Sequence, residues 1–122
     1  PNELSRVGSL VHFIEDVLED GVTGICLDLG HAHLEGDVVE AVETTSEHVL
    51  AVHAHDNRGR SDEHLLPFEG TMDWPSVLTA LQKVGYEGPI TLEPARRGGT
   101  VRESLARARS ARERMERMLA HL

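Results

Sequence analysis

The stretch VLAVHAHDNRGRSDEH, residues 49–64, determines how the rest of the chain is interpreted. It begins as an apolar run rich in β-branched residues, which predicts a strand over about 49–54. The run ends on His53, His55 and Asp56, and Asp62 and His64 follow after a glycine-bearing turn. Side chains two residues apart on an extended segment share a face, so His53 and His55 are expected to lie together. Histidine with carboxylate suits zinc, manganese or a similar divalent cation, and the stretch therefore predicts a metal site.

Two further strand-like segments end in the same kind of residue. Residues 22–28 are apolar up to Asp28, with His31 close behind, and residues 89–93 end on Glu93. Chance can place an acid after one strand, because every strand must stop at something polar. Three such endings, two of them beside histidines, favour a common site. In parallel α/β folds the functional groups collect at the carboxyl ends of the strands, so these side chains are expected to converge.

Four helices are predicted around the strands. Hydrophobic spacing, N-cap residues and glycine stops place them at 3–20, 38–47, 74–84 and 101–120. Residues 30–33 are predicted to form a loop. Strands that alternate with helices imply right-handed crossovers and a parallel sheet, so the expected fold class is α/β, with a single domain over residues 1–122.

The composition fits one globular domain with an aliphatic core. Of its 122 residues, 39% are apolar, 27% are charged and only 3% are aromatic. The net charge of −9 argues against binding to nucleic acid or to an anionic membrane, and no segment is long and apolar enough to span a bilayer. The single cysteine, Cys26, lies in an apolar strand, which indicates a structural thiol in a reducing compartment. Because no signal peptide opens the chain, the cytoplasm is expected by elimination.

The order of the motifs resembles a known group, the xylose isomerase-like TIM-barrel superfamily. The resemblance is carried by DLGH at 28–31, HAHDN at 53–57, DEH at 62–64, Gly70 with Asp73-Trp74, and GPITLE at 88–93. That superfamily includes sugar and sugar-phosphate isomerases and epimerases, and the endonuclease IV-type apurinic/apyrimidinic endonucleases of AP endonuclease family 2. A complete barrel has eight strands, and this chain resembles the last three strand–helix units with the helix before them. The resemblance therefore implies a partial (β/α)8 TIM barrel with three parallel strands and four helices.

The resemblance also implies a role for each motif residue. The ligands of a central divalent metal (zinc, manganese, magnesium or cobalt) would be Asp28, His53 and Glu93. The second group, which holds another zinc in the endonuclease branch, matches His31, Asp62 and His64. In the epimerase branch the residue matching Glu93 is also catalytic, because it works on a substrate proton. Asp56 matches a frequent neighbour of the metal histidine, which it would orient.

Four residues near these ligands are weaker candidates for substrate binding: His55, Arg58, Arg60 and Arg96. His55 is either a ligand or a polar strand end. Arg58 and Arg60 would face a substrate phosphate or balance the nearby acids. Arg96, followed by Arg97 and two glycines before a helix, would hold a phosphate or belong to an ordinary capped loop.

One ligand of the family pattern has no match in this sequence. It is a metal-binding glutamate that ends the strand just before the first helix predicted here. If the chain is complete as given, it is a barrel fragment that lacks at least one metal ligand, so the metal occupancy of the isolated chain is open. We expect little or no isomerase activity from it, because half of the substrate pocket is missing too.

Three functions compete. The leading one is divalent-metal-dependent isomerisation or epimerisation of a sugar or sugar phosphate, in which Glu93 moves the proton. The second is zinc-dependent phosphodiester cleavage at abasic DNA, which the group His31, Asp62 and His64 favours and the acidic charge opposes. The third is a non-catalytic fragment that self-associates as a homo-oligomer or complements another barrel half, because three strands leave two open edges and an open apolar face.

Overall fold

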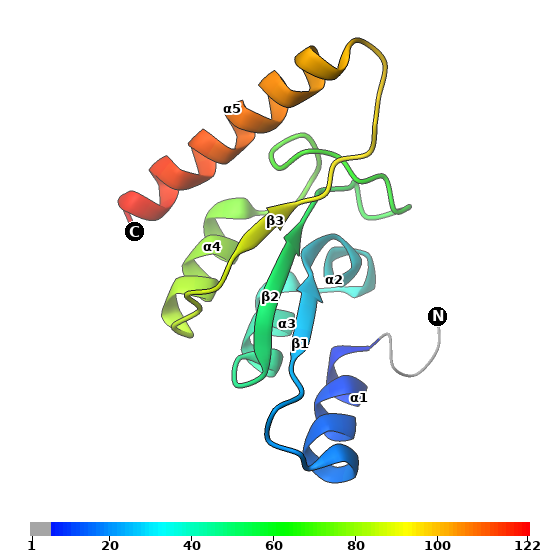
Figure 1. Cartoon of the computed structure of the whole chain (residues 1–122), viewed down its shortest axis with the longest axis vertical. Helices are drawn as coiled ribbons and strands as arrows, with labels where there is room; N and C mark the ends of the chain where they lie inside the picture. The colour runs from blue at the N-terminus through cyan, green and yellow to red at the C-terminus, as the bar shows by residue number, and fades with distance from the viewer. Residues whose placement is uncertain (1–5) are drawn as a thin grey trace.

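The computed structural model describes residues 6–122, so the start of the predicted 3–20 helix lies outside the described residues. Helices and strands alternate along this range (Figure 1). The strands are β1 (Ile25–Asp28), β2 (Val49–Ala54) and β3 (Ile90–Leu92). The helical segments are α1 (Val7–His12), the π-helix η2 (Phe13–Leu18), α2 (Leu29–Glu35), α3 (Val38–Thr45), α4 (Trp74–Lys83) and α5 (Val101–Ala120). None of the helices in residues 6–122 combines the length and the apolar character needed to cross a membrane.

The three strands form one parallel sheet in the order β1-β2-β3, which confirms the predicted α/β fold class. The register pairs Asp28 with His53, and His53 with Thr91. Residues paired in this way sit side by side, about 4.8 Å apart from strand to strand. Glu93 lies two residues beyond Thr91 and so shares its face if the chain stays extended. The register thus brings the acidic and histidine endings of all three strands to one edge of the sheet.

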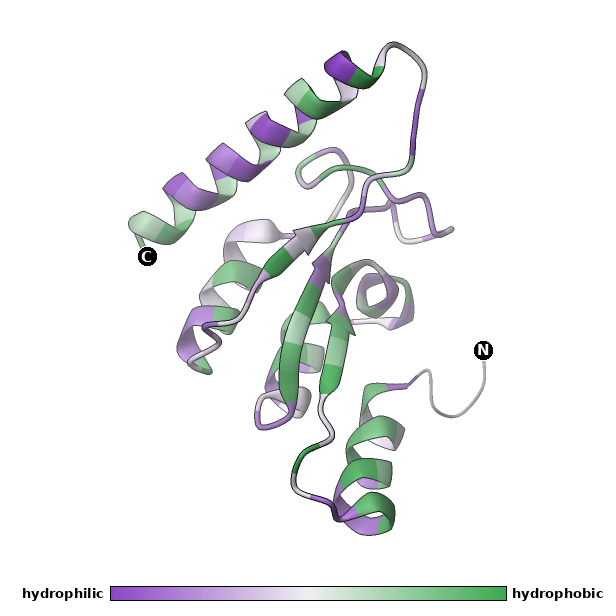
Figure 2. Ribbon diagram, in the orientation of Figure 1, coloured by the Kyte–Doolittle hydropathy of each residue, from purple (hydrophilic) through white to green (hydrophobic). Residues whose placement is uncertain are grey.

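One face of the sheet is covered by α3 and α4, which lie behind the strands in Figure 1. Leu27 of β1 and Val52 of β2 point into this layer and are buried against Val42 of α3 and Leu78 of α4. Figure 2 shows the apolar residues concentrated along the strands and on the helix faces turned toward them. Burial of this apolar surface holds the sheet and helices together and so fixes where the strands end.

The other face of the sheet is turned toward the viewer in Figure 1, and no helix of the described residues crosses it. Cys26 lies between the buried residues Ile25 and Leu27 and is exposed. The thiol of Cys26 is therefore not part of the core, because side chains alternate along a strand and only one face here is covered.

The single helix predicted at 3–20 is divided in two. Its first half is the α-helix α1, and its second half is the π-helix η2, in which the hydrogen-bond pattern widens to Glu19 N donating to Ile14 O at 3.0 Å. The segment ends at Glu19, whose φ of 48° is left-handed, shortly before the predicted stop at Gly21 with φ 70°. The spacing of apolar residues correctly indicated helix but could not distinguish the two kinds of turn.

The predicted loop at 30–33 is wrong, because these residues belong to helix α2. The side chain of Asp28 caps this helix by accepting a hydrogen bond from the N–H of His31 at 2.8 Å. Asp28 therefore ends β1 and starts α2 without an intervening loop. Gly30 lets α2 approach the strand ends, since a Cβ at this position would overlap the imidazole ring of His55.

Candidate metal centre

Asp28, His53 and Glu93 converge at the carboxyl ends of the three strands. One potential ligand atom from each lies within 4.8 Å of the others, and we call these three residues the central triad. The Nδ1 atom of His53 is 2.7 Å from Oε1 of Glu93. The side chains of His53 and Glu93 are about one-third exposed, at 35% and 36%, whereas that of Asp28 is 18% exposed. The triad is thus open to a ligand on one side.

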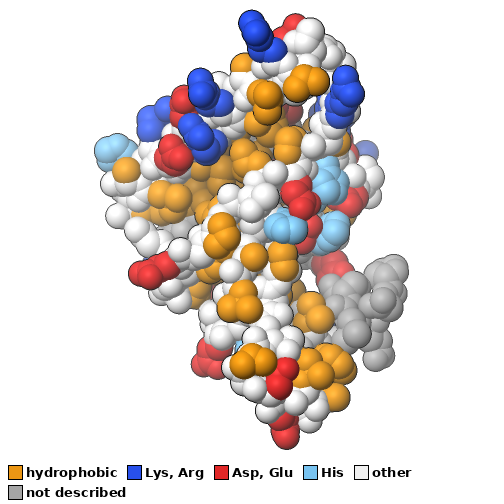
Figure 3. All heavy atoms as spheres, viewed as in Figure 1, with side chains coloured by type: hydrophobic (Ala, Val, Ile, Leu, Met, Phe, Trp, Pro, Cys, Tyr) orange, Lys and Arg blue, Asp and Glu red, His pale blue; other side chains and the backbone are white. Residues whose placement is uncertain are grey.

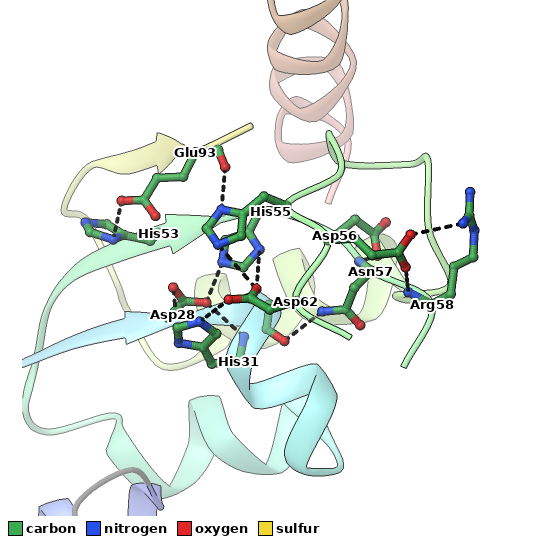
Figure 4. A network of polar contacts seen from close by, with 12 residues as sticks. Asp28, His31, His53, His55, Asp56, Asn57, Arg58, Asp62 and Glu93 are labelled. Carbon is green, nitrogen blue, oxygen red and sulfur yellow. Dashed lines mark hydrogen bonds and ion pairs between the residues drawn. The ribbon is translucent and has the colours of Figure 1, made fainter. Parts of the chain in front are cut away.

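A second group lies beside the central triad and consists of His31, His55, Asp62 and His64, whose potential ligand atoms also lie within 4.8 Å of one another. Figure 4 shows His31, His55 and Asp62 meeting next to Asp28, and Figure 3 shows histidine and acidic side chains side by side on one part of the surface. Asp62 is the centre of this histidine-rich group. Its Oδ2 atom is 3.0 Å from Nε2 of His31, and its Oδ1 atom is 3.2 Å from Nε2 of His64.

His55 connects the two groups. The sequence indicated it only as a weak candidate, either a ligand or a polar strand end. It is fully buried, and its ring stacks on that of His64 with centroids 3.8 Å apart. Its Nε2 atom is 2.7 Å from Oδ1 of Asp28, whereas its Nδ1 atom is 3.8 Å from Oδ1 of Asp62 and has no hydrogen bond within the described residues. Buried polar atoms are nearly always satisfied, so Nδ1 fits a cation that would accept its lone pair while Nε2 faces the carboxylate of Asp28. The signal in the sequence was its two-residue spacing from His53.

The electrostatic environment keeps the two aspartates ionised. Burial raises the pKa of Asp28, but the nearby His55 ring, the N–H of His31 and the charges of these histidines outweigh it, so the pKa lies below its usual range. The same balance holds for Asp62, where partial burial is outweighed by the hydrogen bond and charge of His31 and by the charges of His64 and His55. A metal ligand must be deprotonated, and both carboxylates meet that requirement at neutral pH.

His64 is held in one tautomer. Its Nδ1–H donates to the carbonyl oxygen of Glu93 at 2.8 Å, so the lone pair is on Nε2, the atom that faces Asp62. This hydrogen bond raises the pKa of His64; burial opposes the rise, and the charge of Asp62 adds to it. The backbone carbonyl thereby orients a histidine nitrogen toward the histidine-rich group.

Asp56 does not contact a histidine of either group in the described residues, so the expected role of orienting a metal histidine is not seen. Its buried carboxylate accepts hydrogen bonds from the N–H of Gly70 at 3.1 Å, the N–H of Met72 at 3.2 Å and the indole N–H of Trp74 at 2.8 Å. Asp56 therefore organises the loop that joins β2 to α4. This loop also carries Asp62 and His64.

Asn57 is a buried polar residue that sequence reasoning missed. Its side-chain amide donates to the carbonyl oxygen of Gly30 at 2.9 Å, and its Oδ1 atom accepts from the N–H of Gly59 at 2.8 Å. These two bonds connect the end of β2 with α2 and with the turn that follows. Nothing in the local pattern distinguishes this asparagine from one in a solvated loop, because both bonds involve distant or irregular backbone.

The arginines proposed for substrate binding lie in different places. Arg58 makes an ion pair with Glu63 at 3.0 Å, which supports the balancing role considered for it, while Arg60 is exposed. Arg96 and Arg97 line a cavity that also includes His64. Arg97 donates to the carbonyl oxygen of Glu63 at 2.7 Å. Only the arginines after β3 are therefore next to the histidine-rich group through a shared cavity.

A third set of potential ligands, Glu15, Glu47 and His48, lies near the amino end of β2. His48 and Glu15 form an ion pair at 2.8 Å. Because functional groups of parallel sheets gather at the opposite end of the strands, this pair is interpreted as a structural contact between η2 and the turn before β2.

Comparison with known proteins places these features in a family. Residues 3–120 match a family model described as "Xylose isomerase-like TIM barrel". Among curated proteins, "Uncharacterized protein y4fM" of Sinorhizobium fredii is 35% identical over 100 residues, which cover 80% of this chain and 32% of the relative. "Uncharacterized protein MJ1311" of Methanocaldococcus jannaschii is 39% identical over 88 residues, which cover 70% of this chain and 30% of the relative. The chain thus spans about a third of the length of these relatives.

Solved structures match the fold over almost the whole chain. A D-tagatose 3-epimerase-like protein has a TM-score of 0.79 at 29% identity, covering 96% of this chain and 43% of that one. A xylose isomerase domain protein from Alicyclobacillus acidocaldarius has a TM-score of 0.78 at 27% identity, covering 94% and 43%. D-Psicose 3-epimerase from Clostridium cellulolyticum has a TM-score of 0.77 at 22% identity, which supports the fold alone. The predicted partial TIM barrel agrees with these coverages.

Proposed function

Because the chain belongs to the xylose isomerase-like TIM barrel family, we propose that it forms part of a divalent-metal-dependent isomerase or epimerase of a sugar or sugar phosphate. The observation that carries this proposal is the convergence of Asp28, His53 and Glu93 within 4.8 Å at the carboxyl ends of the strands. The D-tagatose 3-epimerase-like protein, at 29% identity, supports a sugar as the substrate class.

The donor set suits a hard or borderline cation such as manganese, zinc, magnesium or cobalt, because it combines two carboxylates with one imidazole. When bound, such a cation polarises a substrate carbonyl and stabilises the negative charge that develops on proton removal. Asp28 is the most enclosed member of the triad and remains ionised because of its lowered pKa, so we assign it to binding alone.

We assign proton transfer to Glu93. Its carboxylate is 36% exposed, so a substrate can reach it, and its Oε1 atom is 2.7 Å from His53 Nδ1, which fixes its position. Isomerisation and epimerisation need a second group to complete the proton transfer, and the family pattern supplies a further glutamate for this. We therefore propose that the 122 residues by themselves turn over little or no substrate.

Titration of the purified chain with Mn²⁺ or Zn²⁺ by calorimetry tests the triad. His53→Ala and Glu93→Gln should each weaken binding by roughly 10–100-fold, because each removes one of the few protein ligands. His121→Ala is the matched control, since this histidine is exposed just beyond α5 and far along the chain from the triad. Unchanged affinity in His53→Ala would refute the assignment.

A second candidate function, zinc-dependent phosphodiester cleavage, is favoured by one specific observation. The histidine-rich group offers a further set of ligands for a cation, and Nδ1 of the buried His55 lacks a hydrogen bond within it. The net charge of −9 opposes DNA binding. The number of metal ions bound per chain separates the candidates. Loss of one bound ion in His53→Ala supports the isomerase. Loss of further bound ions in Asp62→Asn, together with cleavage of abasic DNA, supports the phosphodiesterase.

A further inference from the structure

A small cavity next to the histidine-rich group has no role in the proposed metal chemistry. It measures about 230 Å³ and lies between the loop that joins β2 to α4, the loop that follows β3 and the first turns of α5. We call it the arginine pocket, and its principal lining residues are His64, Leu66, Arg96, Arg97, Leu105 and Arg107. Its volume is below the roughly 300–1,000 Å³ of pockets for drug-sized ligands, so it suits one small group rather than a whole cofactor.

The charge of the arginine pocket is opposite to that of the molecule. The chain carries a net charge of −9, yet three arginines, Arg96, Arg97 and Arg107, are among the residues that line this one cavity. Among residues 6–122 none of the three forms an ion pair with a carboxylate, although Glu69 also lines the cavity. Figure 3 shows the basic side chains gathered over α5 and the loop before it. A net positive pocket on an acidic protein is a site for an anion.

The chemistry of the walls narrows the kind of anion. Arginine presents a planar fork of N–H donors that matches phosphate oxygens, and the Ser104 hydroxyl provides a further donor in the cavity. Apolar side chains, Leu66 and Leu105 among them, line the cavity beside these donors and Glu69.

The position of the pocket connects it to the proposed reaction site. His64 belongs to both the histidine-rich group and the pocket wall, and the carbonyl oxygen of Glu93 bonds its ring at 2.8 Å. A molecule whose reactive carbons lie at Glu93 can therefore extend an anionic end past His64 into the cavity.

We propose that the arginine pocket binds the phosphoryl group of the substrate, so that the substrate class is a sugar phosphate rather than a free sugar. This inference rests on the proposed isomerase or epimerase function and selects between its two substrate classes. Arg96 and Arg107 are the specificity-determining residues, since Arg97 is partly engaged with the carbonyl oxygen of Glu63.

Binding measured without metal tests this proposal separately from the metal centre. The 122-residue chain is titrated in EDTA with ribose 5-phosphate, with ribose and with inorganic phosphate, using chemical-shift changes or calorimetry. Ribose 5-phosphate should bind, inorganic phosphate should compete with it, and ribose should not bind at the same concentrations. Arg96→Gln/Arg107→Gln should weaken ribose 5-phosphate binding by about tenfold or more, because it removes two charge-assisted donors.

Arg102→Gln/Arg109→Gln is the matched control, because it removes the same charge from exposed positions of α5 outside the pocket. This control should keep its affinity within about twofold, since exposed charges contribute little. Equal weakening in both double variants, or equal binding of ribose and ribose 5-phosphate, would overturn the proposal. Circular dichroism verifies that each variant is folded. If the original chain binds metal but not ribose 5-phosphate, only this inference is rejected. If it binds ribose 5-phosphate but not metal, only the proposed metal centre is rejected.

Discussion

His55 is enclosed by groups that leave it little freedom. Its ring is fully buried, stacks on His64 and lies against the backbone of Gly30. Its Nδ1 atom has no hydrogen bond within the described residues, and an unsatisfied buried polar group costs of order 1–3 kcal/mol. The side chain is thus kept where it destabilises the metal-free chain, as expected for a residue whose partner is a bound cation.

Gly30→Ala should destabilise the chain by about 1–3 kcal/mol, because its Cβ would overlap the His55 ring and force α2 away from the strand ends. Urea unfolding measures the effect. The control is Gly8→Ala in α1, where no atom lies within 4 Å of the new Cβ. It should stabilise by about 0.5–1 kcal/mol, because glycine is unfavourable inside a helix. If both substitutions acted alike, the close packing of Gly30 on His55 would be contradicted.

The pair Asp62 and His64 should make stability depend on pH in metal-free buffer. The lowered pKa of Asp62 contributes stability above about pH 3.9, which is lost as the pH falls through its folded value. The raised pKa of His64 contributes stability in full below about pH 6.5, which is lost as the pH rises through its folded value. The joint contribution is therefore greatest between about pH 4 and 6.5.

Comparison with Asp62→Asn isolates this contribution. The difference in unfolding free energy between the original chain and the variant, followed by urea unfolding in EDTA, should be largest in that window and shrink on both sides. Glu63→Gln is a neighbouring control, whose carboxylate pairs with Arg58 instead. A difference for Asp62→Asn that stays constant from about pH 3 to about pH 9 would exclude the interaction, since this range includes the ordinary pKa of an aspartate and that of a histidine.

At the scale of elements, Asp28 and Asp56 each have a second task. Asp28 ends β1, caps α2 and contributes to the central triad. Asp56 follows β2 and holds the loop before α4 through buried hydrogen bonds. Carboxylates at strand ends therefore serve two purposes in this fold, since some hold backbone N–H groups while others remain available to a ligand.

Asp56→Ala should cost about 3–5 kcal/mol, because it leaves the indole N–H of Trp74 and the N–H groups of Gly70 and Met72 buried without a charged acceptor. Trp74 is the single tryptophan of the chain, so its fluorescence reports the unfolding directly. Asp73→Ala removes only an exposed N-cap of α4 and should cost about 1 kcal/mol. A smaller loss in Asp56→Ala than in Asp73→Ala would show that the loop is held by other contacts.

At the scale of the whole molecule, the described sheet has two edges and one uncovered face. β1 and β3 are the edge strands, and Cys26 of β1 is exposed on the uncovered face. Unpaired strand edges are templates for pairing with another chain, and exposed apolar area costs about 25 cal/mol per Å². The 122-residue chain is therefore expected to self-associate, or to bind a complementing barrel half.

Sedimentation velocity of the purified chain should show dimers or larger species whose share grows with concentration. Cys26→Glu should shift the distribution toward the monomer, because it places a charge on the uncovered face of an edge strand. Leu122→Glu, at a leucine that is 48% exposed at the chain end, should leave the distribution unchanged. A stable monomer of the original chain at micromolar concentration would reject the expectation.

The sequence alone determined the elements and their order. Alternating apolar runs and capped amphipathic segments are local patterns, so three parallel strands and the helix at 101–120 could be predicted from them. The residues nominated as ligands came from the same patterns, because parallel strands must end at one edge of a sheet. Local reasoning failed where one residue had two tasks, as with Asp28, which led to the wrong loop at 30–33.

Only the tertiary structure decided which of the polar residues are buried and what they contact. Asp56 and His55 are adjacent in sequence, yet one binds loop N–H groups and the other lies between the two ligand groups. Their environments are built by segments distant in the chain, including Gly30 and the loop near Trp74. Burial and hydrogen bonding are set by such long-range packing, whereas periodicity and capping depend on neighbours within a few residues.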